Sequence, residues 1–467
     1  MTTKKVLILI PYEDISEELS VKRKVIYPVE PAIVVSILKQ NNIKVQGIDL
    51  NKDYKNEKQI FDFLKISLKK LNPDIVLIMS SHLTFLIKEQ YEVNVKLIQL
   101  IKEYKKTIKI ILSGTNPTAF PEKYFKNKYI PDILFRGEIE NQILNIINNI
   151  NDSEILYNII GVCYKNQISG KINYIEDLDV LPIADRNIFD YKDYFNYPEI
   201  GNLRYPEKSR KFTHISVTRG CNTNCSFCKV KYLRKKYRWR SIENIINEIK
   251  FLLNKGIEEI IFLDENLLLN KVKAKKLFRK IISEKLKFYW FGGCGLPLYM
   301  LDKELLELMK ESGCYKLPLA VESGTQRILT DIMNKPVDLK KHVPLIEYAK
   351  KIGFEIIGYF MIGLPTETKN EILETVKLAE NKMFDYVVFS IYTPEKGTDL
   401  YEYCLENNLL KNNEIGNLSK RAESNLKFPD FDNTFLVEIR NEKWKEINFE
   451  DENRKKKLSK MFGVNYE

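Results

Sequence analysis

Residues 216–228 read Ser216-Val217-Thr218-Arg219-Gly220-Cys221-Asn222-Thr223-Asn224-Cys225-Ser226-Phe227-Cys228, a compact triplet of cysteines in the spacing C-x3-C-x2-C. Three thiolates are one fewer than a closed tetrahedral zinc site uses, and one fewer than a cubane iron-sulfur cluster needs to ligate every iron. The triplet therefore predicts a metal centre with one coordination position open to an exchangeable ligand. The alternative is a structural zinc site that takes a fourth ligand elsewhere, and His214 lies just upstream.

The spacing, with an aromatic residue directly before the third cysteine, resembles that of the radical SAM superfamily. The resemblance implies that Cys221, Cys225 and Cys228 ligate three irons of a 4Fe-4S cluster. The fourth iron is then chelated by the amino and carboxylate groups of S-adenosylmethionine, and one electron from the cluster cleaves this cofactor to a 5'-deoxyadenosyl radical. An external one-electron reductant such as flavodoxin or ferredoxin is the expected partner.

The chain has 467 residues, which predicts two or three domains. Seven cysteines and a polar N-terminal start without an apolar signal region predict a cytoplasmic protein. No stretch approaches the roughly 20 apolar residues that cross a bilayer, so no membrane partner is expected.

Lysine and arginine total 74 against 63 acidic residues, a net charge of +11. The tightest basic run, 229–240, follows the cysteines and could attract phosphate or RNA. Because the lysines are otherwise scattered through amphipathic segments, a solvated helix face is the favoured interpretation, and nucleic acid is not an expected partner.

The N-terminal region, 1–147, alternates continuous apolar runs with segments of helical periodicity. The expected strands are 6–11, 44–49, 73–80 and 108–112, and the expected helices are 30–41, 57–70 and 88–104. Buried strands separated by helices predict a parallel sheet covered on both faces, an α/β domain of the Rossmann or flavodoxin-like type. Ligands on such sheets lie beyond the carboxyl ends of the strands.

Three segments at those ends, 28–32, 113–117 and 136–140, resemble in their order the cobalamin-binding domain that precedes many radical SAM domains. The resemblance implies a cobalamin site, with contacts from Ser80, Ser113, Gly114 and Gly137. The segments are poorer in glycine than the family pattern, so a purely structural flavodoxin-like domain is the alternative. No Asp-x-His-x-x-Gly segment is present, so no histidine is expected to replace the lower base of cobalamin.

Residues 148–210 are irregular and are expected to form a linker. Residues 211–410 are expected to form the second domain, with strands at 214–217, 259–263, 287–291, 316–321, 355–368 and 386–392. The resemblance implies a partial (β/α)6 TIM barrel, whose active site lies at the carboxyl ends of its strands. A small charged C-terminal extension, 411–467, is expected to cover the barrel mouth or contact substrate.

The strand ends supply the residues that the resemblance places around S-adenosylmethionine. Asp264 and Glu265 are expected beside its methionine part, although Asp264 could instead cap the following helix. Glu322 and Ser323, in a Glu-Ser-Gly-Thr-Gln string close to one common in the family, are expected to hydrogen-bond the ribose and the methionine carboxylate.

Two glycines and one cysteine complete the expected site. Gly358 and Gly363 would let the nucleoside lie against the backbone. No catalytic residue is identified with certainty; Cys294 could donate to or carry the reacting group, but a lone cysteine is more often buried.

The two resemblances together predict a cobalamin-dependent radical SAM methyltransferase that acts on an unactivated carbon, or on phosphorus, of a small natural product or peptide. One alternative is a radical enzyme for rearrangement, cyclisation or oxidation, in which cobalamin is not the methyl donor. Another is a non-catalytic iron-sulfur or zinc protein. The sequence leaves the substrate and the oligomeric state open.

Overall fold

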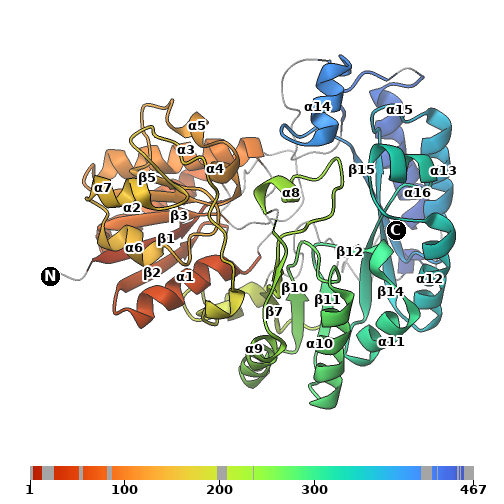
Figure 1. Ribbon diagram of the computed structural model, residues 1–467, viewed down its shortest axis with the longest axis horizontal. Helices are drawn as coiled ribbons and strands as arrows, with labels where there is room; N and C mark the ends of the chain where they lie inside the picture. Colours follow the sequence, from red (N-terminus) through yellow and green to blue (C-terminus); the bar gives the residue numbers. More distant parts are fainter. Residues whose placement is uncertain are drawn as a thin grey trace. The chain divides into compact units, whose positions relative to one another are not determined.

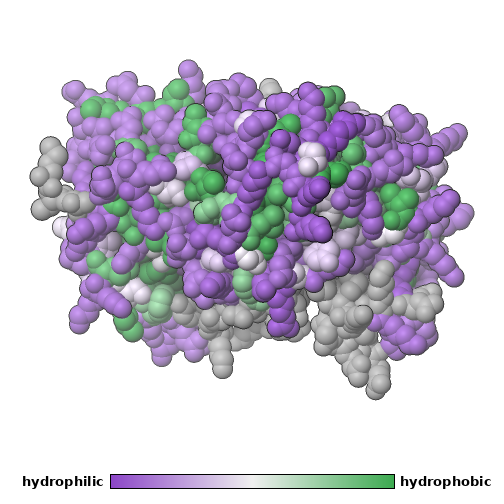
Figure 2. Space-filling view, turned by 90° about the horizontal axis from the view of Figure 1, so that it is seen from below, coloured by the Kyte–Doolittle hydropathy of each residue, from purple (hydrophilic) through white to green (hydrophobic). Residues whose placement is uncertain are grey.

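The computed structural model divides the chain into two compact units, Met1–Arg204 and Tyr205–Glu467. It describes residues 4–12, 26–51, 56–80, 87–196, 208–234, 236–411, 423–428, 430–449, 452 and 454–456. Within those ranges, no helix combines the length and the apolar character that a membrane span requires. The space-filling view of one face is largely hydrophilic, with small scattered apolar areas (Figure 2).

The first unit is built on one sheet of strands in the order β2-β1-β3-β4-β5-β6. The first five strands in this order run parallel, and β6 pairs antiparallel to β5 at the edge. The strands are β1 (Lys5–Ile10), β2 (Lys44–Asp49), β3 (Ile75–Met79), β4 (Lys109–Ser113), β5 (Ile133–Phe135) and β6 (Val162–Tyr164). The order 2-1-3-4-5 is that of flavodoxin-like folds, so the predicted fold class of this unit is confirmed.

Amphipathic helices cover this sheet (Figure 1). They are α1 (Val29–Gln40), α2 (Glu57–Leu71), α3 (Ile87–Tyr104), α4 (Thr115–Ala119), α5 (Pro121–Tyr124), α6 (Ile143–Asn148) and α7 (Ser153–Asn158). Leu64 of α2 and Leu97 of α3 are fully buried in one cluster with Leu9, Ile78 and Leu112 from alternate positions of the central strands. Side chains at alternate strand positions share one face of a sheet, so α2 and α3 pack on the same face.

The predicted linker, 148–210, is divided between the units: its residues 148–196 belong to the first unit and 208–210 to the second, so the structure differs from the expected boundary. Besides β6, it forms short 3-10 turns at η1 (Leu178–Val180) and η2 (Tyr191–Asn196). A long-range hydrogen bond ties η2 to the sheet, from Tyr194 Oη to Asp49 Oδ2 at 2.6 Å. Such contacts leave no periodic pattern in the sequence, which explains why the segment resembles a linker.

The described part of the second unit contains six principal parallel strands and one parallel strand of two residues, which form the partial barrel that the sequence predicts. One sheet has the order β11-β10-β7 and the other β12-β13-β14-β15; a bridge between Trp290 and Cys314 links the chain at β11 to the start of β13. The strands are β7 (Phe212–Ile215), β10 (Glu259–Phe262), β11 (Tyr289–Gly292), β12 (Leu296–Pro297), β13 (Lys316–Glu322), β14 (Glu355–Ile362) and β15 (Tyr386–Ile391). β14 ends earlier than predicted because Gly363, with φ 75°, leaves the extended conformation.

Figure 1 shows a row of helices along the outside of these strands. They are α9 (Ile242–Asn254), α10 (Lys271–Ser283), α11 (Lys303–Glu311), α12 (Leu339–Lys351) and α13 (Lys369–Ala379). Ser241 is the N-cap of α9, since its side chain accepts a hydrogen bond from Asn244 N. Capping side chains of this kind fix where a helix begins, and the helices in turn hold the strand ends in place.

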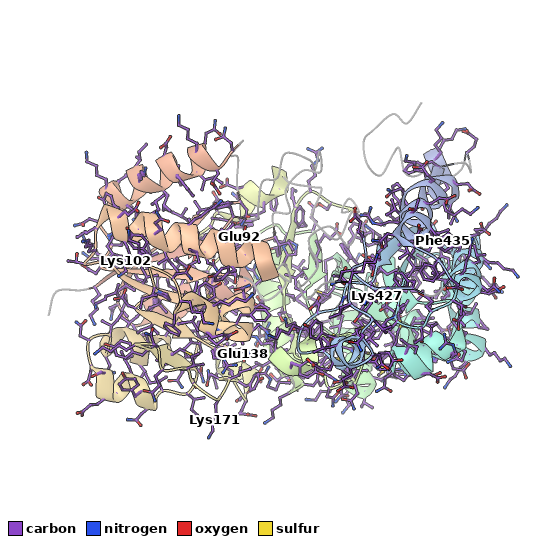
Figure 3. The ribbon with its side chains drawn as sticks, turned by 90° about the horizontal axis from the view of Figure 1, so that it is seen from above. Glu92, Lys102, Glu138, Lys171, Lys427 and Phe435 are labelled. Atoms are coloured by element: carbon purple, nitrogen blue, oxygen red, sulfur yellow. The ribbon has the colours of Figure 1, made fainter. Side chains whose placement is uncertain are left out.

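The described part of the C-terminal extension packs on the last strand. It forms α15 (Asn433–Glu438), the π-helical turn η6 (Ile439–Lys443) and α16 (Trp444–Phe449); Figure 3 labels Phe435 on α15. Asn448 accepts from Val387 N at 3.0 Å and donates to Val387 O at 3.1 Å, and Trp444 Nε1 donates to the same oxygen at 2.9 Å. These bonds satisfy backbone groups of β15 that a further strand would otherwise pair.

Candidate cluster and cofactor site

The cysteine loop, residues 220–228, lies beyond β7 and is held at its start by a small antiparallel ribbon. β8 (Thr218–Arg219) pairs with β9 (Arg238–Trp239), and Cys221 N donates to Arg234 O at 3.3 Å. Gly220 has φ 83°, and a Cβ atom there would lie 2.4 Å from the carbonyl oxygens of Arg234 and Lys236. Only glycine fits between the loop and the chain that returns past it.

The basic run 229–240 is part of this architecture, and the prediction of a solvated helix face was wrong. Only α8 (Val230–Leu233) is helical, and Arg238 is buried on β9. Arg240 pairs with buried Glu248 at 2.5 Å. Arg234 also lies 3.4 Å from the largely buried carboxylate of Glu265, so at least two cations of this run serve internal ion pairs.

Two carboxylates after β10 hold the backbone that enters the loop. Asp264 Oδ1 accepts from Val217 N at 3.0 Å and from the Thr218 hydroxyl at 2.7 Å, and also from Thr218 N. Glu265 Oε2 accepts from Gly220 N at 3.1 Å. Burial, opposed by these hydrogen bonds, raises the pKa of Asp264 to about 7.

The alternative role of Asp264 as a helix cap is wrong, because the side chain of Asn270 caps α10 by accepting from Lys273 N. The second oxygen of Asp264, Oδ2, is buried with no hydrogen-bond partner among the described residues. The same holds for Oδ1 of Asn266. Buried acceptors of this kind fit a ligand that brings its own donors, such as an ammonium group.

Each cysteine has its own surroundings. Cys221 Sγ lies 3.6 Å from the Asn266 amide nitrogen and 3.4 Å from the Thr223 hydroxyl. Tyr299 links these two groups, since its hydroxyl accepts from Asn266 Nδ2 at 3.1 Å and lies 2.9 Å from Thr223 Oγ1. Cys225 is buried, and the positive charge of Lys335 favours its thiolate form.

Lys335 belongs to a segment that clamps the cysteine loop. Ser226 N donates to Met333 O at 3.0 Å, and Asn334 Nδ2 donates to Asn224 O at 2.9 Å. The Lys335 ammonium pairs with Glu322 Oε1 at 2.5 Å, with both side chains largely buried. Burial by itself lowers the pKa of Lys335, but the charge and hydrogen bond of Glu322 together with the Cys225 charge outweigh it, so the pKa is raised.

Glu322 stands at the carboxyl end of β13 with φ 70°. Left-handed backbone is costly for a residue with a side chain and persists where its surroundings fix it, most often at ligand sites. The carboxylate that the sequence assigns to S-adenosylmethionine is thus held by Lys335 beside the cysteines.

The donor set suits a metal centre. Burial raises the pKa of the Cys225 thiol to about 11 and that of Cys228 to about 12. Metal binding deprotonates a coordinating thiol and supplies the positive charge that a buried thiolate needs. All seven cysteines, each within the described ranges, are free thiols.

The zinc alternative gains no ligand set from the structure. His214 is buried on β7 with its ring edge-on to Phe212. Among the described residues, no three His, Cys, Asp or Glu side chains are grouped to hold one metal ion. Thiolates that ligate separate irons of a cubane do not converge on one ion.

Three other predicted cofactor residues contact their own chain. Ser323 Oγ is fully buried and bonds Thr375 Oγ1 at 3.2 Å and Thr325 N at 3.1 Å. A Cβ at Gly358 would lie 2.7 Å from the Phe360 ring, and one at Gly363 would lie 2.8 Å from Leu436. Internal packing alone accounts for both glycines. Cys294 is exposed after β11, so the expectation that it is more often a buried core thiol was wrong here.

The predicted cobalamin residues lie at the carboxyl edge of the first sheet. Ser80 follows β3, and Ser113 is the last residue of the neighbouring strand β4. Both are buried, and neither hydroxyl has a hydrogen-bond partner among the described residues. A Cβ at Gly114, where φ is 128°, would lie 2.0 Å from Ser80 Oγ. The unpaired hydroxyls fit a ligand rich in amide donors and acceptors.

Gly137 has a different setting. It packs against the Ile172–Asn173 backbone, where a Cβ would lie 2.2 Å from Asn173 O. Its neighbour Glu138, labelled in Figure 3, accepts from Ile175 N at 2.9 Å. This corner anchors the segment that follows the sheet.

Sequence reasoning missed Thr223, Asn266, Tyr299 and Lys335. Asn266 carried a usable signal, since it follows two predicted cofactor carboxylates at one strand end. Tyr299 and Lys335 lie far from the cysteines in sequence, and only the barrel brings them close.

The comparisons with known proteins agree with this geometry. The family model described as the radical SAM superfamily matches residues 215–379. An uncharacterized methyltransferase of Pyrococcus horikoshii is 30% identical over 357 residues, 75% of this chain and 73% of that protein. Cytidylyl-2-hydroxyethylphosphonate methyltransferase of Streptomyces wedmorensis is 26% identical over 378 residues, 74% of this chain and 68% of that protein.

Among solved structures, the radical S-adenosylmethionine methyltransferase TsrM of Kitasatospora setae, with cobalamin and a [4Fe-4S] cluster bound, superposes with a TM-score of 0.69. The match covers 86% of this chain and 78% of that chain at 14% identity. At this identity the likeness establishes the fold, both the flavodoxin-like unit and the partial barrel.

Proposed function

Because this chain belongs to the radical SAM superfamily, we propose that it is a cobalamin-dependent methyltransferase acting on an unactivated carbon, or on phosphorus, of a small molecule or peptide. The observation that carries the proposal is the cysteine loop itself. Asp264 and Glu265 hold its entry and the 333–335 segment holds its centre, so three thiols are positioned and no fourth protein ligand joins them among the described residues.

Cys221, Cys225 and Cys228 would hold a 4Fe-4S cluster, and the buried oxygens Asp264 Oδ2 and Asn266 Oδ1 would accept from the ammonium group of S-adenosylmethionine. When bound, cluster and S-adenosylmethionine supply a substrate-activating radical, and cobalamin supplies a transferable methyl group. The chain itself contributes positioning and the exclusion of water, which hold the reacting groups together.

Ser80, Ser113 and the backbone at Gly114 would contact cobalamin. Support comes from their unpaired buried hydroxyls at neighbouring strand ends, the place where flavodoxin-like sheets bind ligands. The relatives supply a second line of support, because both the phosphonate-modifying relative and the superposed structure are named as methyltransferases. The name of the former makes a phosphonate its substrate.

Anaerobic reconstitution tests the proposal. The protein is loaded with iron, sulfide and hydroxocobalamin, reduced with dithionite or with flavodoxin, and given S-adenosylmethionine with candidate acceptors. We expect both S-adenosylhomocysteine and 5'-deoxyadenosine, and neither product from a Cys228→Ala variant. Formation of 5'-deoxyadenosine alone, by a protein that does not bind hydroxocobalamin, would contradict methyl transfer and favour a rearrangement or oxidation instead.

A further inference from the structure

The three cysteines differ in the groups that face their sulfur atoms. Cys221 Sγ faces a side-chain amide, Asn266 Nδ2 at 3.6 Å. Cys225 is influenced by the positive charge of Lys335, and Cys228 has a backbone partner, the N–H of Val230. Cys221 is therefore the cysteine whose hydrogen-bonding surroundings depend on a neutral side chain from a distant strand.

The amide of Asn266 is fixed in place. The residue is 3% exposed in the loop that follows β10, and its nitrogen also donates to the Tyr299 hydroxyl at 3.1 Å. That hydroxyl lies 2.9 Å from Thr223 Oγ1, inside the cysteine loop. The two N–H groups of the amide thus serve Cys221 and Tyr299, and rotation of the amide would break both contacts.

We propose that Asn266 is a positioning residue for the cluster, which raises the cluster's reduction potential by donating an N–H to the Cys221 thiolate, with Tyr299 holding the amide in place. The inference rests on the proposed function, because it requires a cluster on the three cysteines. A donor to a thiolate stabilises negative charge, and the reduced cluster carries one more negative charge than the oxidised cluster. The hydrogen bond therefore favours reduction.

The test compares reconstituted wild-type protein with Asn266→Leu, which keeps the size of the side chain and removes the donor. Reduction is followed by electron paramagnetic resonance during a redox titration, with iron and sulfide content measured on each sample. We expect a lower potential in the variant, equivalent to about a tenfold smaller ratio of reduced to oxidised cluster at a fixed potential, or about 59 mV for one electron.

Two further variants separate tuning from damage. Tyr299→Phe removes the hydroxyl and keeps the ring, so a smaller fall in the same direction is expected; it carries the test if Asn266→Leu does not retain iron. Asn254→Leu, at an exposed position at the end of α9, is the matched control and is expected to keep the wild-type potential.

The outcomes distinguish this inference from the proposed function. If the wild-type protein binds a cluster and cleaves S-adenosylmethionine while Asn266→Leu and Tyr299→Phe both keep its potential, the inference alone is overturned. If the wild-type protein binds no cluster, the proposed function and the inference both fall.

Discussion

At the carboxyl end of β10, the carboxylates of Asp264 and Glu265 accept hydrogen bonds from the backbone that leads into the cysteine loop. At the carboxyl ends of β3 and β4, by contrast, the hydroxyls of Ser80 and Ser113 are equally buried, with no hydrogen-bond partner among the described residues. Both regions belong to parallel sheets whose strand ends are the usual ligand sites.

The difference follows from what each region would bind. A metal centre is held by a few ligands at fixed distances, so the loop that carries them must be rigid before the metal arrives. A large organic cofactor is held by many weak contacts, so its site needs polar groups that the protein leaves unused. At the end of β10, one oxygen of each carboxylate is used to hold the cysteine loop, whereas the Ser80 and Ser113 hydroxyls make no hydrogen bond to the described residues.

The largest loss of stability around the cysteine loop is expected when the Lys335–Glu322 ion pair is broken. In Lys335→Met the buried Glu322 carboxylate loses its partner, and breaking such pairs costs about 3–5 kcal/mol. Chemical denaturation should show this loss in the unfolding of the second unit. The double variant Lys335→Met/Glu322→Gln removes both charges and should recover most of the stability; a single variant as stable as wild type would show that the pair does not hold the loop.

Gly114→Ala is the corresponding change in the first unit. The new Cβ would lie 2.0 Å from Ser80 Oγ and 2.9 Å from Ser80 O, at φ 128°. Overpacking of this kind costs about 1–3 kcal/mol, to which backbone strain adds. Thermal unfolding and hydroxocobalamin titration should both show the change. Gly170→Ala is the matched control, because no atom lies within 4 Å of its Cβ position, and it should leave both measurements unchanged.

How far the sequence predicts these regions depends on the kind of signal. Continuous apolar runs between amphipathic segments predicted the parallel sheet of the first unit, because the residue types of a strand show locally that it is buried. The partial barrel of the second unit was instead implied by the family resemblance. The resemblance placed the cysteines on the loop after the first barrel strand, where the structure has them. Residues 148–196 escaped this reasoning, since hydrogen bonds such as Tyr194 to Asp49 join positions far apart in the chain.

Within the site, the sequence predicted residue types at strand ends better than it predicted their contacts. Asp264 and Glu265 lie where expected but bind backbone of the cysteine loop. Gly358 and Gly363 are explained by packing against Phe360 and Leu436. A strand-end position follows from topology, but the atom that a side chain contacts depends on elements that arrive from elsewhere in the fold.

Glu367 tests whether the carboxyl end of β14, like that of β10, has a buried carboxylate that is bonded to its own backbone and excluded from water. It is fully buried, and its Oε2 accepts from Gly363 N at 2.7 Å and Leu364 N at 3.0 Å. Burial, opposed by these bonds, raises its pKa from 4.5 to about 8. Between these values the folded protein holds a proton on Glu367 that the unfolded chain releases. The contribution of Glu367 to the free energy of unfolding is therefore greatest below pH 4.5 and falls as the pH rises to 8.

The expected slope from this one group is up to about 1.4 kcal/mol per pH unit. Glu367→Gln removes the titrating group, so its stability should fall less steeply than that of wild type across this range, as measured by denaturant unfolding at several pH values. Parallel pH profiles for the two proteins would mean that the carboxyl titrates near its ordinary pKa and that the region is open to water.

Replacing one serine in each region makes the smallest change and the most direct comparison. Ser323→Ala removes a hydroxyl bonded to Thr375 Oγ1 and Thr325 N, leaving buried groups without a partner, at a cost of about 1–3 kcal/mol. Ser113→Ala removes an equally buried hydroxyl that bonds to none of the described residues, so stability should change by less than about 1 kcal/mol. Hydroxocobalamin affinity should fall in Ser113→Ala and stay unchanged in Ser323→Ala. Equal losses of stability in the two variants would mean that the Ser113 hydroxyl already has a hydrogen-bond partner within the protein and is not free to bond a ligand.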